Sequence, residues 1–263
     1  MLLEDKNAVV YGAGGAVGGA VARAFAREGA NVFVAGRTLE TLEAVAADIS
    51  AAGGRVETSR LDALEENAVD AHADAVARSA GSIDVSFNAI GHGDVQGPPL
   101  LRMPFDDFIR PVTVALRAQF NTTRAAARHM VGRGSGVILA ITATTARHAI
   151  PEVGGTGVSF DAIESLSRQW ASELGPQGVR VVWLRTTGLP EAISTTLELF
   201  PDYGTGSGGM TRAQLIEWLR AKTMLKRLTT LAEIGDAAAF LASDRAGAMT
   251  AAGANLSCGS VPD

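Results

Sequence analysis

Four glycines near the start of the chain offer the backbone chemistry of a phosphate site. Gly12, Gly14, Gly15 and Gly18 occur in the run GAGGAVGG, which also holds Val17. Glycine tolerates positive φ and lets a ligand approach the backbone closely, because it has no Cβ. A helix that begins inside this run presents free N–H groups and a positive dipole end to an anion. The pattern predicts a dinucleotide pyrophosphate site with these residues in contact; the alternative is a tight connection between a strand and a helix.

Arg37 and Asp62 are the next candidates along the chain. At the end of the second strand of a dinucleotide fold, an acidic residue accepts from the ribose 2′-hydroxyl, whereas an arginine pairs with a 2′-phosphate. Arg37 therefore favours NADP over NAD, and its alternative role is a solvated arginine that opens the next helix. Asp62 can accept from an adenine amino group, and it can also cap the helix expected near Glu65.

Histidines and threonines offer acid–base chemistry further along. His92 and His148 each follow an apolar, strand-like run. A histidine near its ordinary pKa of about 6.5 is a competent acid or base. Threonine hydroxyls can orient a carbonyl group or a water, and the candidates are Thr142, Thr144, Thr145 and Thr156. The alternatives are solvated histidines and ordinary β-forming threonines. Neither histidine comes with a thiolate or paired-carboxylate pattern, so a metal site is not expected.

Alternating strand and helix patterns must bring these residues together. Strands are expected at residues 7–11, 31–35, 56–61, 83–90, 136–141, 179–184 and 254–257. Helices are expected after Gly15 and at residues 39–51, 65–80, 103–131, 153–174, 212–221 and 234–243. Residues 103–131 are expected to form one long helix or two, with Pro111 as the expected point of interruption. The alternation predicts a single α/β domain over residues 1–263, with ligands at the carboxyl ends of the strands.

Composition narrows the classes of partner. The chain has 263 residues, of which 47% are hydrophobic and 19% charged, and its net charge is −5 without a basic run. This argues against a nucleic-acid or anionic-membrane surface. Charged residues close to Met1 and the lack of a long apolar run predict a cytoplasmic protein without a membrane span. The single cysteine, Cys258, excludes an internal disulfide. Residues 189–226 include a glycine-rich stretch and are expected to form a lid over a small-molecule ligand.

On several motifs the chain resembles the short-chain dehydrogenase/reductase family. Gly12 and Gly18 match its Gly-x-x-x-Gly-x-Gly pattern, with Ala16 in place of the middle glycine, and Asn88-Ala89 stands where the family has Asn-Ala-Gly. ELGPQGVRV at 173–181 and the segment around 240–256 are similar to its C-terminal half. The resemblance implies a Rossmann-type doubly wound, mostly parallel seven-stranded sheet with helices on both faces. It also implies a nicotinamide cofactor, cofactor contacts at Asn88 and Ala89, and a homodimer or homotetramer.

The family's catalytic residues are replaced. Its Tyr-x-x-x-Lys pair, in which the tyrosine is the acid/base and the lysine lowers its pKa and holds the ribose, falls at Thr156 and Phe160. Its serine falls at Ala143, and its helix asparagine falls near Ala115. A threonine hydroxyl titrates far outside the working range, and a phenylalanine supplies neither a cation nor a hydrogen bond. The family's usual mechanism is therefore not available here.

Two hypotheses follow. The first is an oxidoreductase that binds NADP(H), with NAD(H) as the other cofactor, and acts on a carbonyl or alcohol substrate with an atypical acid among Thr142, His148 and Thr156. The second is a degenerate or non-redox relative of the family. Such a protein would be a ligand-binding or partner subunit, or catalyse a lyase or cyclase step, and it need not bind a cofactor.

Overall fold

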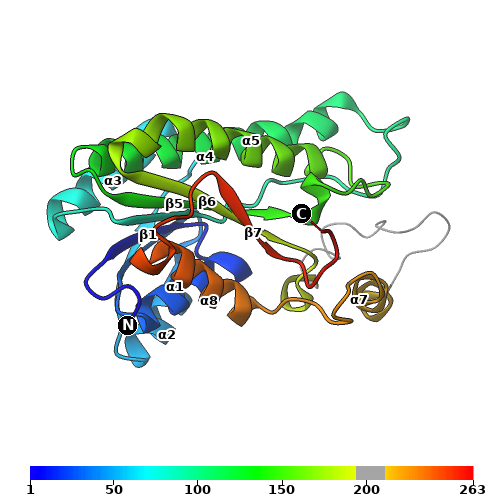
Figure 1. The fold of residues 1–263 in the computed structure, drawn as a ribbon. Helices are drawn as coiled ribbons and strands as arrows, with labels where there is room; N and C mark the ends of the chain where they lie inside the picture. The colour runs from blue at the N-terminus through cyan, green and yellow to red at the C-terminus, as the bar shows by residue number, and fades with distance from the viewer. Residues whose placement is uncertain (194–210, 263) are drawn as a thin grey trace.

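The computed structural model describes residues 1–193 and 211–262. Seven strands form one sheet in the order β3-β2-β1-β4-β5-β6-β7, and every neighbouring pair is parallel (Figure 1). The strands are β1 (Asn7–Tyr11), β2 (Asn31–Gly36), β3 (Arg55–Arg60), β4 (Val85–Asn88), β5 (Gly136–Ala143), β6 (Val179–Thr186) and β7 (Ala252–Leu256). The order reverses between β1 and β4, so the expected doubly wound class is confirmed, with β7 parallel as well.

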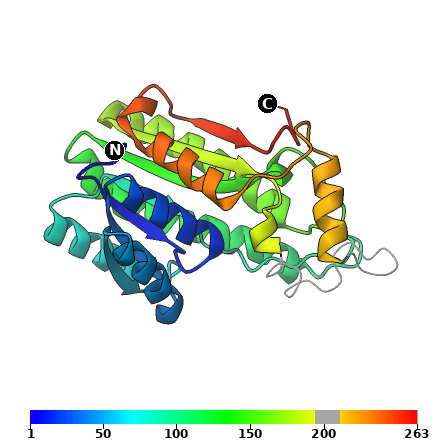
Figure 2. The same ribbon diagram turned by 90° about the horizontal axis from the view of Figure 1, so that it is seen from below.

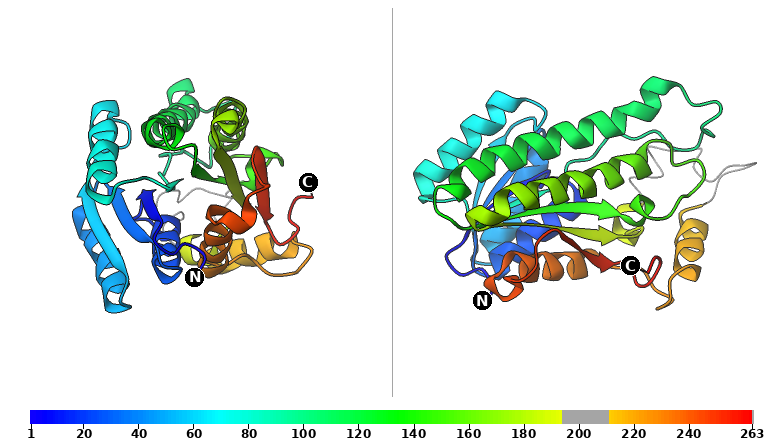
Figure 3. Two further views of the ribbon diagram at one scale, coloured as in Figure 1. Left: turned by 60° about the vertical axis from the view of Figure 1, so that its left-hand side comes forward. Right: turned by 45° about the horizontal axis from the view of Figure 1, so that its top comes forward.

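Helices cover both faces of this sheet. One layer holds α1 (Ala16–Arg27), α2 (Leu39–Ala51) and α8 (Leu231–Ala242), and the other holds α3 (Glu66–Ala80), α4 (Phe105–Val131) and α5 (Thr156–Leu174) (Figures 1 and 3). Each helix turns an apolar stripe to the sheet, because a parallel sheet must be covered on both faces. The carboxyl ends of the strands therefore meet along one open edge.

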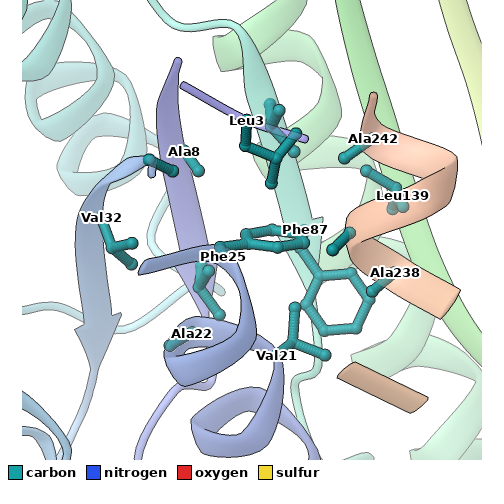
Figure 4. Packing of buried hydrophobic residues seen from close by; sticks show 14 of the residues in the cluster. Leu3, Ala8, Val21, Ala22, Phe25, Val32, Phe87, Leu139, Ala238 and Ala242 are labelled. Carbon is teal, nitrogen blue, oxygen red and sulfur yellow. The ribbon is translucent and has the colours of Figure 1, made fainter. Parts of the chain in front are cut away.

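The core between β1, β4, α1 and α8 fixes the position of the glycine turn. All five residues of β1 are buried. Phe25 of α1 and Phe87 of β4 meet edge to face at 6.4 Å between ring centroids, next to Val21 and Ala238 (Figure 4). Burying these side chains stabilises the fold by roughly 2 kcal/mol for each large residue. The two strand ends that carry the candidate site are thus held by one rigid packing layer.

The helices agree closely with the periodicities, and the largest exception is at Pro111. The observed α2 has the expected bounds, whereas α4 runs unbroken through Pro111 and corrects the expected interruption. The proline removes one backbone donor, but it is buried and packs closely on the turn before α5, where a Cβ on Gly155 would lie 3.0 Å from its Cγ. Tertiary packing between α4 and α5 therefore outweighs the local cost.

The stretch expected to be a lid is described only in part. Residues 194–210 lie outside the described residues, so the lid remains a prediction. Beyond them, α7 (Arg212–Ala221) begins at a Thr211 capping box. It lies at the end of the molecule to which the arrowheads of β6 and β7 point (Figure 2). Among the helices described, none is long and apolar enough to cross a bilayer.

Candidate functional site

The glycine turn after β1 is built on close backbone contacts. Gly12 has a φ of +77°, and a Cβ there would lie 2.7 Å from the carbonyl carbon of Ala89. A Cβ on Gly18 would lie 2.8 Å from the carbonyl carbon of Gly12. Real Cβ atoms do not approach backbone this closely, so both positions require glycine. The turn after β1 and the turn after β4 consequently form one surface.

The start of α1 opens onto this surface. Its N-cap is Gly15, which supplies no capping side chain. The Gly15 N–H donates to the Gly12 carbonyl at 3.1 Å, and the Gly19 N–H is the next to find a backbone acceptor, the Gly15 carbonyl at 2.8 Å. The intervening first-turn N–H groups, that of Val17 included, are the orphan donors of a helix start. They form an anion site of the kind predicted for the pyrophosphate.

A cavity of about 300 Å³ continues from the glycine turn across the ends of β2, β3 and β4. Its lining includes Gly12, Gly14, Gly15, Arg37, Asp62 and Ala89. The structure thus brings most of the predicted cofactor-contacting residues to one place. Gly18, Val17 and Asn88 are not among the residues that line it.

Asp62 plays a different local role from the expected cap. The N-cap of α3 is Glu65, and the Asp62 carboxylate accepts from the Leu64 N–H at 3.0 Å. Asp62 therefore closes the turn that precedes the helix, which corrects the capping alternative. Asp62 still lines the cavity, as a contact with an adenine amino group requires.

Arg37 lines the cavity, and Arg60 contacts Arg37 from the neighbouring strand. Arg37 is exposed. Arg60, at the end of β3, donates from Nε to the Arg37 carbonyl at 3.2 Å. Neither arginine forms an ion pair within the described part of the chain. Other arginines, such as Arg23, Arg124 and Arg185, each form an ion pair with a carboxylate. Sequence reasoning missed Arg60, although its register opposite Gly36 in neighbouring strands could have found it.

Asn88 shapes the cavity without lining it. Its side chain is buried, donating from Nδ2 to Thr122 Oγ1 at 2.9 Å and accepting at Oδ1 from the Ile90 N–H at 2.9 Å. One of its two N–H donors and one lone pair of its amide oxygen are thereby used inside the protein. Asn88 holds the turn in which Ala89 faces the cavity.

The positions that the sequence predicts for the family's asparagine and lysine hold apolar residues that pack together. Ala115 of α4 is buried in a small cluster with Ala140, Ile163 and Trp183, and Phe160 of α5 packs against it. Ala143 ends β5 and precedes a short 3-10 helix, residues Thr144–Ala146. No proton relay can run through alanine and phenylalanine side chains, so the polar path that the resemblance implies is absent at these positions.

Thr156, at the position that the sequence predicts for the family's tyrosine, is held in a polar group with Asp94 and Gln96. Its hydroxyl donates to Asp94 Oδ2 at 2.8 Å and accepts from Gln96 Nε2 at 3.3 Å. The same amide nitrogen also donates to Asp94 Oδ2 at 2.5 Å. A hydroxyl has one proton, and here it is used. Asp94 and Gln96 were not among the predicted residues, because nothing local in the sequence links them to Thr156.

Thr142 points into a buried ion-pair cluster. Its hydroxyl donates to Glu164 Oε1 at 3.0 Å. Glu164 is fully buried, and Arg185 donates to its two carboxylate oxygens at 2.8 Å each. Arg147 approaches the same carboxylate at 3.4 Å. This cluster ties β5, β6 and α5 together, and its charges compensate each other as buried charges must.

The two histidines of the predicted site have opposite surroundings. His148 is exposed, and its backbone N–H donates to the Thr144 carbonyl at 2.9 Å. His92 is buried, with Nδ1 3.2 Å from Ser159 Oγ and its ring 5.0 Å from that of Phe160. Burial lowers the pKa of His92 to about 4, and the charge of Asp94 opposes this shift. Within the described residues, no three His, Cys, Asp or Glu side chains come close enough together to hold a metal ion.

The sheet order and the close-packed glycine turn define a protein of the doubly wound α/β class. The family model described as Enoyl-(Acyl carrier protein) reductase matches residues 12–260, and the chain belongs to this branch of the short-chain dehydrogenases/reductases. The uncharacterized oxidoreductase YxbG of Bacillus subtilis is 31% identical over 92% of this chain and 86% of its own. The 7alpha-hydroxysteroid dehydrogenase of Escherichia coli K12 is 29% identical over 93% and 89%.

Solved structures give the same result. NAD+-bound xylitol dehydrogenase matches with a TM-score of 0.91 and 26% identity, covering 98% of this chain and all of its own. A 7α-hydroxysteroid dehydrogenase complexed with NADH and 7-oxo glycochenodeoxycholic acid matches with a TM-score of 0.87 and 27% identity, over 99% and 96%. The predicted family is therefore confirmed.

Proposed function

We propose that this protein is an NADP(H)-dependent oxidoreductase that interconverts a small alcohol and the corresponding carbonyl compound. The observation that carries the proposal is the glycine cradle, in which Gly12 and Gly18 are packed too closely for any Cβ. It opens onto the uncapped start of α1. Relatives named as dehydrogenases, two of them solved with NAD+ or NADH, support a nicotinamide cofactor for this chain.

The described residues fit the adenosine and pyrophosphate part of such a cofactor. The first-turn N–H groups of α1 would hold the pyrophosphate, and the cavity beside Arg37 and Asp62 would hold the adenosine. When bound, the cofactor supplies a hydride acceptor or donor. The fit ends at Phe160, which cannot hydrogen-bond a ribose as the family's lysine does, so affinity must depend on the adenosine end.

Arg37 and Arg60 favour NADP over NAD. Two exposed guanidinium groups flank the end of β2, and Gly36 occupies the last position of that strand, where no carboxylate is present to accept from a ribose 2′-hydroxyl. Guanidinium groups bind phosphate in forked geometry and carry their charge at every physiological pH. The negative charge of a 2′-phosphate would be balanced by these two guanidinium groups.

Calorimetric titration of the protein with NADPH and NADH tests this proposal. We expect NADPH to bind more tightly than NADH, and Arg37→Ala to weaken NADPH about 10- to 100-fold while NADH changes less than about twofold, since a lost charged hydrogen bond costs roughly 1.5–3 kcal/mol. Arg78→Ala, at an exposed arginine on α3, is the matched control. No binding of either nucleotide, or equal losses for both, would contradict the proposal.

A non-redox role is the second candidate, and the replacement of the relay by the apolar cluster of Ala115 and Phe160 favours it. The two candidates differ in turnover. Compounds in the relatives' names form a first panel: xylitol, gluconate, D-threitol and carveol for oxidation, and 7-oxo glycochenodeoxycholic acid for reduction. Nucleotide binding with no exchange of hydride across this panel would favour the non-redox role.

A further inference from the structure

We propose that His92 is the catalytic base of this protein, accepting the substrate's hydroxyl proton at Nε2 during alcohol oxidation. The assignment rests on the proposed oxidoreductase function. It departs from the candidates that the sequence favoured, because the structure shows which side chains have a proton or a lone pair to offer.

The three residues that the sequence favoured as the acid or base are not free to act. The two threonines already donate their hydroxyl protons to other residues, and the histidine is exposed on a loop. Thr156 gives its only proton to Asp94, and Thr142 gives its own to Glu164. Both hydroxyls also titrate far outside the working range, so neither replaces a tyrosine. His148 is exposed on the loop beyond β5, and no side-chain hydrogen bond of it is recorded in the described part of the chain.

The hydrogen bonds around Ser159 set the tautomer of His92. Ser159 Oγ lies 2.8 Å from the Thr156 carbonyl, which can only accept, so the hydroxyl proton of Ser159 points there. Ser159 Oγ must therefore accept from His92, 3.2 Å away, and His92 carries its proton on Nδ1. In the neutral ring the lone pair is then on Nε2, for which no partner is recorded among residues 1–193 and 211–262. A fixed tautomer with an unused acceptor is what a general base requires.

The position of His92 is equally suitable. It follows β4 at the carboxyl edge of the sheet, and its ring lies against the Phe160 ring and Ser159. These residues belong to the first turns of α5, the part of the family's fold in which Thr156 and Phe160 replace the catalytic pair. His92 therefore lies beside the vacated position of the acid/base.

Burial and the charge of Asp94 act on the pKa of His92 in opposite directions. Burial lowers the pKa of the ring to about 4, which keeps the ring neutral at neutral pH and also makes it a weaker proton acceptor than an ordinary histidine. Asp94 is the charged group that acts on the ring, and it favours the imidazolium when this forms. The residues of α5 that touch the ring, Ser159 and Phe160, are uncharged. Asp94, Thr156 and Ser159 are thus positioning residues.

The proposed step is balanced as follows. The O–H bond of the alcohol breaks and its proton goes to Nε2 of His92, while the carbinol C–H bond breaks and its hydride goes to NADP+. The alcohol is oxidised to the carbonyl compound, and NADP+ is reduced to NADPH. His92 then releases the proton to solvent, which leaves one carbonyl compound, one NADPH and one proton.

His92→Asn tests the assignment, because an asparagine amide can still donate to Ser159 but has nothing in the place of Nε2. With the panel compound that the protein oxidises fastest, we expect kcat to fall about 100-fold or more, the usual contribution of a general base. NADPH affinity and the urea midpoint should stay near those of the unmodified protein. His148→Asn is the matched control, and we expect it to leave kcat unchanged. An unchanged kcat in His92→Asn, or an equal loss in His148→Asn, would overturn the assignment.

A second measurement requires no substrate. Long-range 15N NMR of the histidine rings distinguishes the two neutral tautomers, and His92→Asn assigns the signal. We expect a protonated Nδ1 in the full-length protein, with a change in tautomer or exchange in Ser159→Ala. A protonated Nε2 would overturn the role of His92 even if NADPH binds, whereas failure of NADPH to bind would overturn the proposed function whatever the tautomer.

Discussion

The cavity beside β1 and β2 and the cluster beside β4 and α5 belong to the same edge of the sheet, yet they keep very different amounts of the family's pattern. The cavity retains the close-packed glycines and the open helix start. In the cluster, the positions that the sequence predicts for the family's asparagine, tyrosine and lysine hold Ala115, Thr156 and Phe160. Dinucleotide binding depends on backbone and on missing side chains, which many sequences provide, whereas proton transfer depends on particular side chains that single substitutions remove.

The largest effect on stability and on NADPH binding should come from a substitution in the glycine turn that borders the cavity. Gly12→Ala combines a positive φ with a contact of 2.7 Å between its Cβ and the Ala89 backbone. We expect a loss of about 2–4 kcal/mol in the free energy of unfolding, together with loss of NADPH binding. Gly53→Ala, with a φ of +81° and nothing within 4 Å of the new Cβ, is the matched control and should lose only about 1 kcal/mol. Urea denaturation measures both, and equal losses would show that the close contact is unimportant.

The next effect is on pH dependence, and it comes from two histidines whose pKa values are lowered, His72 and His92. His72 packs edge to face on Tyr11 of β1, and both of its ring nitrogens are buried without a partner among the described residues. Burial lowers the pKa of His72 to about 4, as it does for His92. A lowered folded-state pKa gives stability that is present above the unfolded value of about 6.5 and is lost as the pH falls toward 4.

Lowering the pH from 7.5 to 5 should therefore cost up to about 2 kcal/mol for each of the two histidines. His72→Leu should remove the share of His72, and His92→Asn the share of His92. His148→Leu, at an exposed histidine, should leave the slope unchanged. Urea midpoints at the two pH values measure this. A slope that survives in both buried-histidine variants would contradict the expectation.

The smallest effect should sharpen the description of the cavity rim. Arg60 is exposed and is held by its Nε to the Arg37 carbonyl. We expect Arg60→Ala to weaken NADPH binding about two- to fivefold, as is usual for an exposed charge, without affecting NADH. The titration used for Arg37→Ala measures it. A loss for NADH as large as that for NADPH would mean that Arg60 supports the loop and does not meet the 2′-phosphate.

Much of this protein could be predicted from its sequence, and the errors have physical reasons. Strand and helix patterns gave the class of fold because apolar periodicity directly reflects which face is buried. The interruption expected at Pro111 is not present, because the packing of α4 on α5 outweighs the low helix propensity of proline. One of the two roles expected for Asp62 was to cap α3, but the N-cap is Glu65, three residues further along, because Asp62 closes the turn that precedes the helix.

The sequence by itself determined the sheet, the glycine cradle and the residue types present at Thr156 and Phe160, since each of these depends on residue types at short spacing. Only the tertiary structure decided where the protons lie. Thr156 meets Asp94 across 62 residues, and His92 meets Ser159 across 67. A hydroxyl or an imidazole can act only with the proton or lone pair that its partners leave unused. Because those partners come from distant segments, no local pattern could have distinguished His92 from His148.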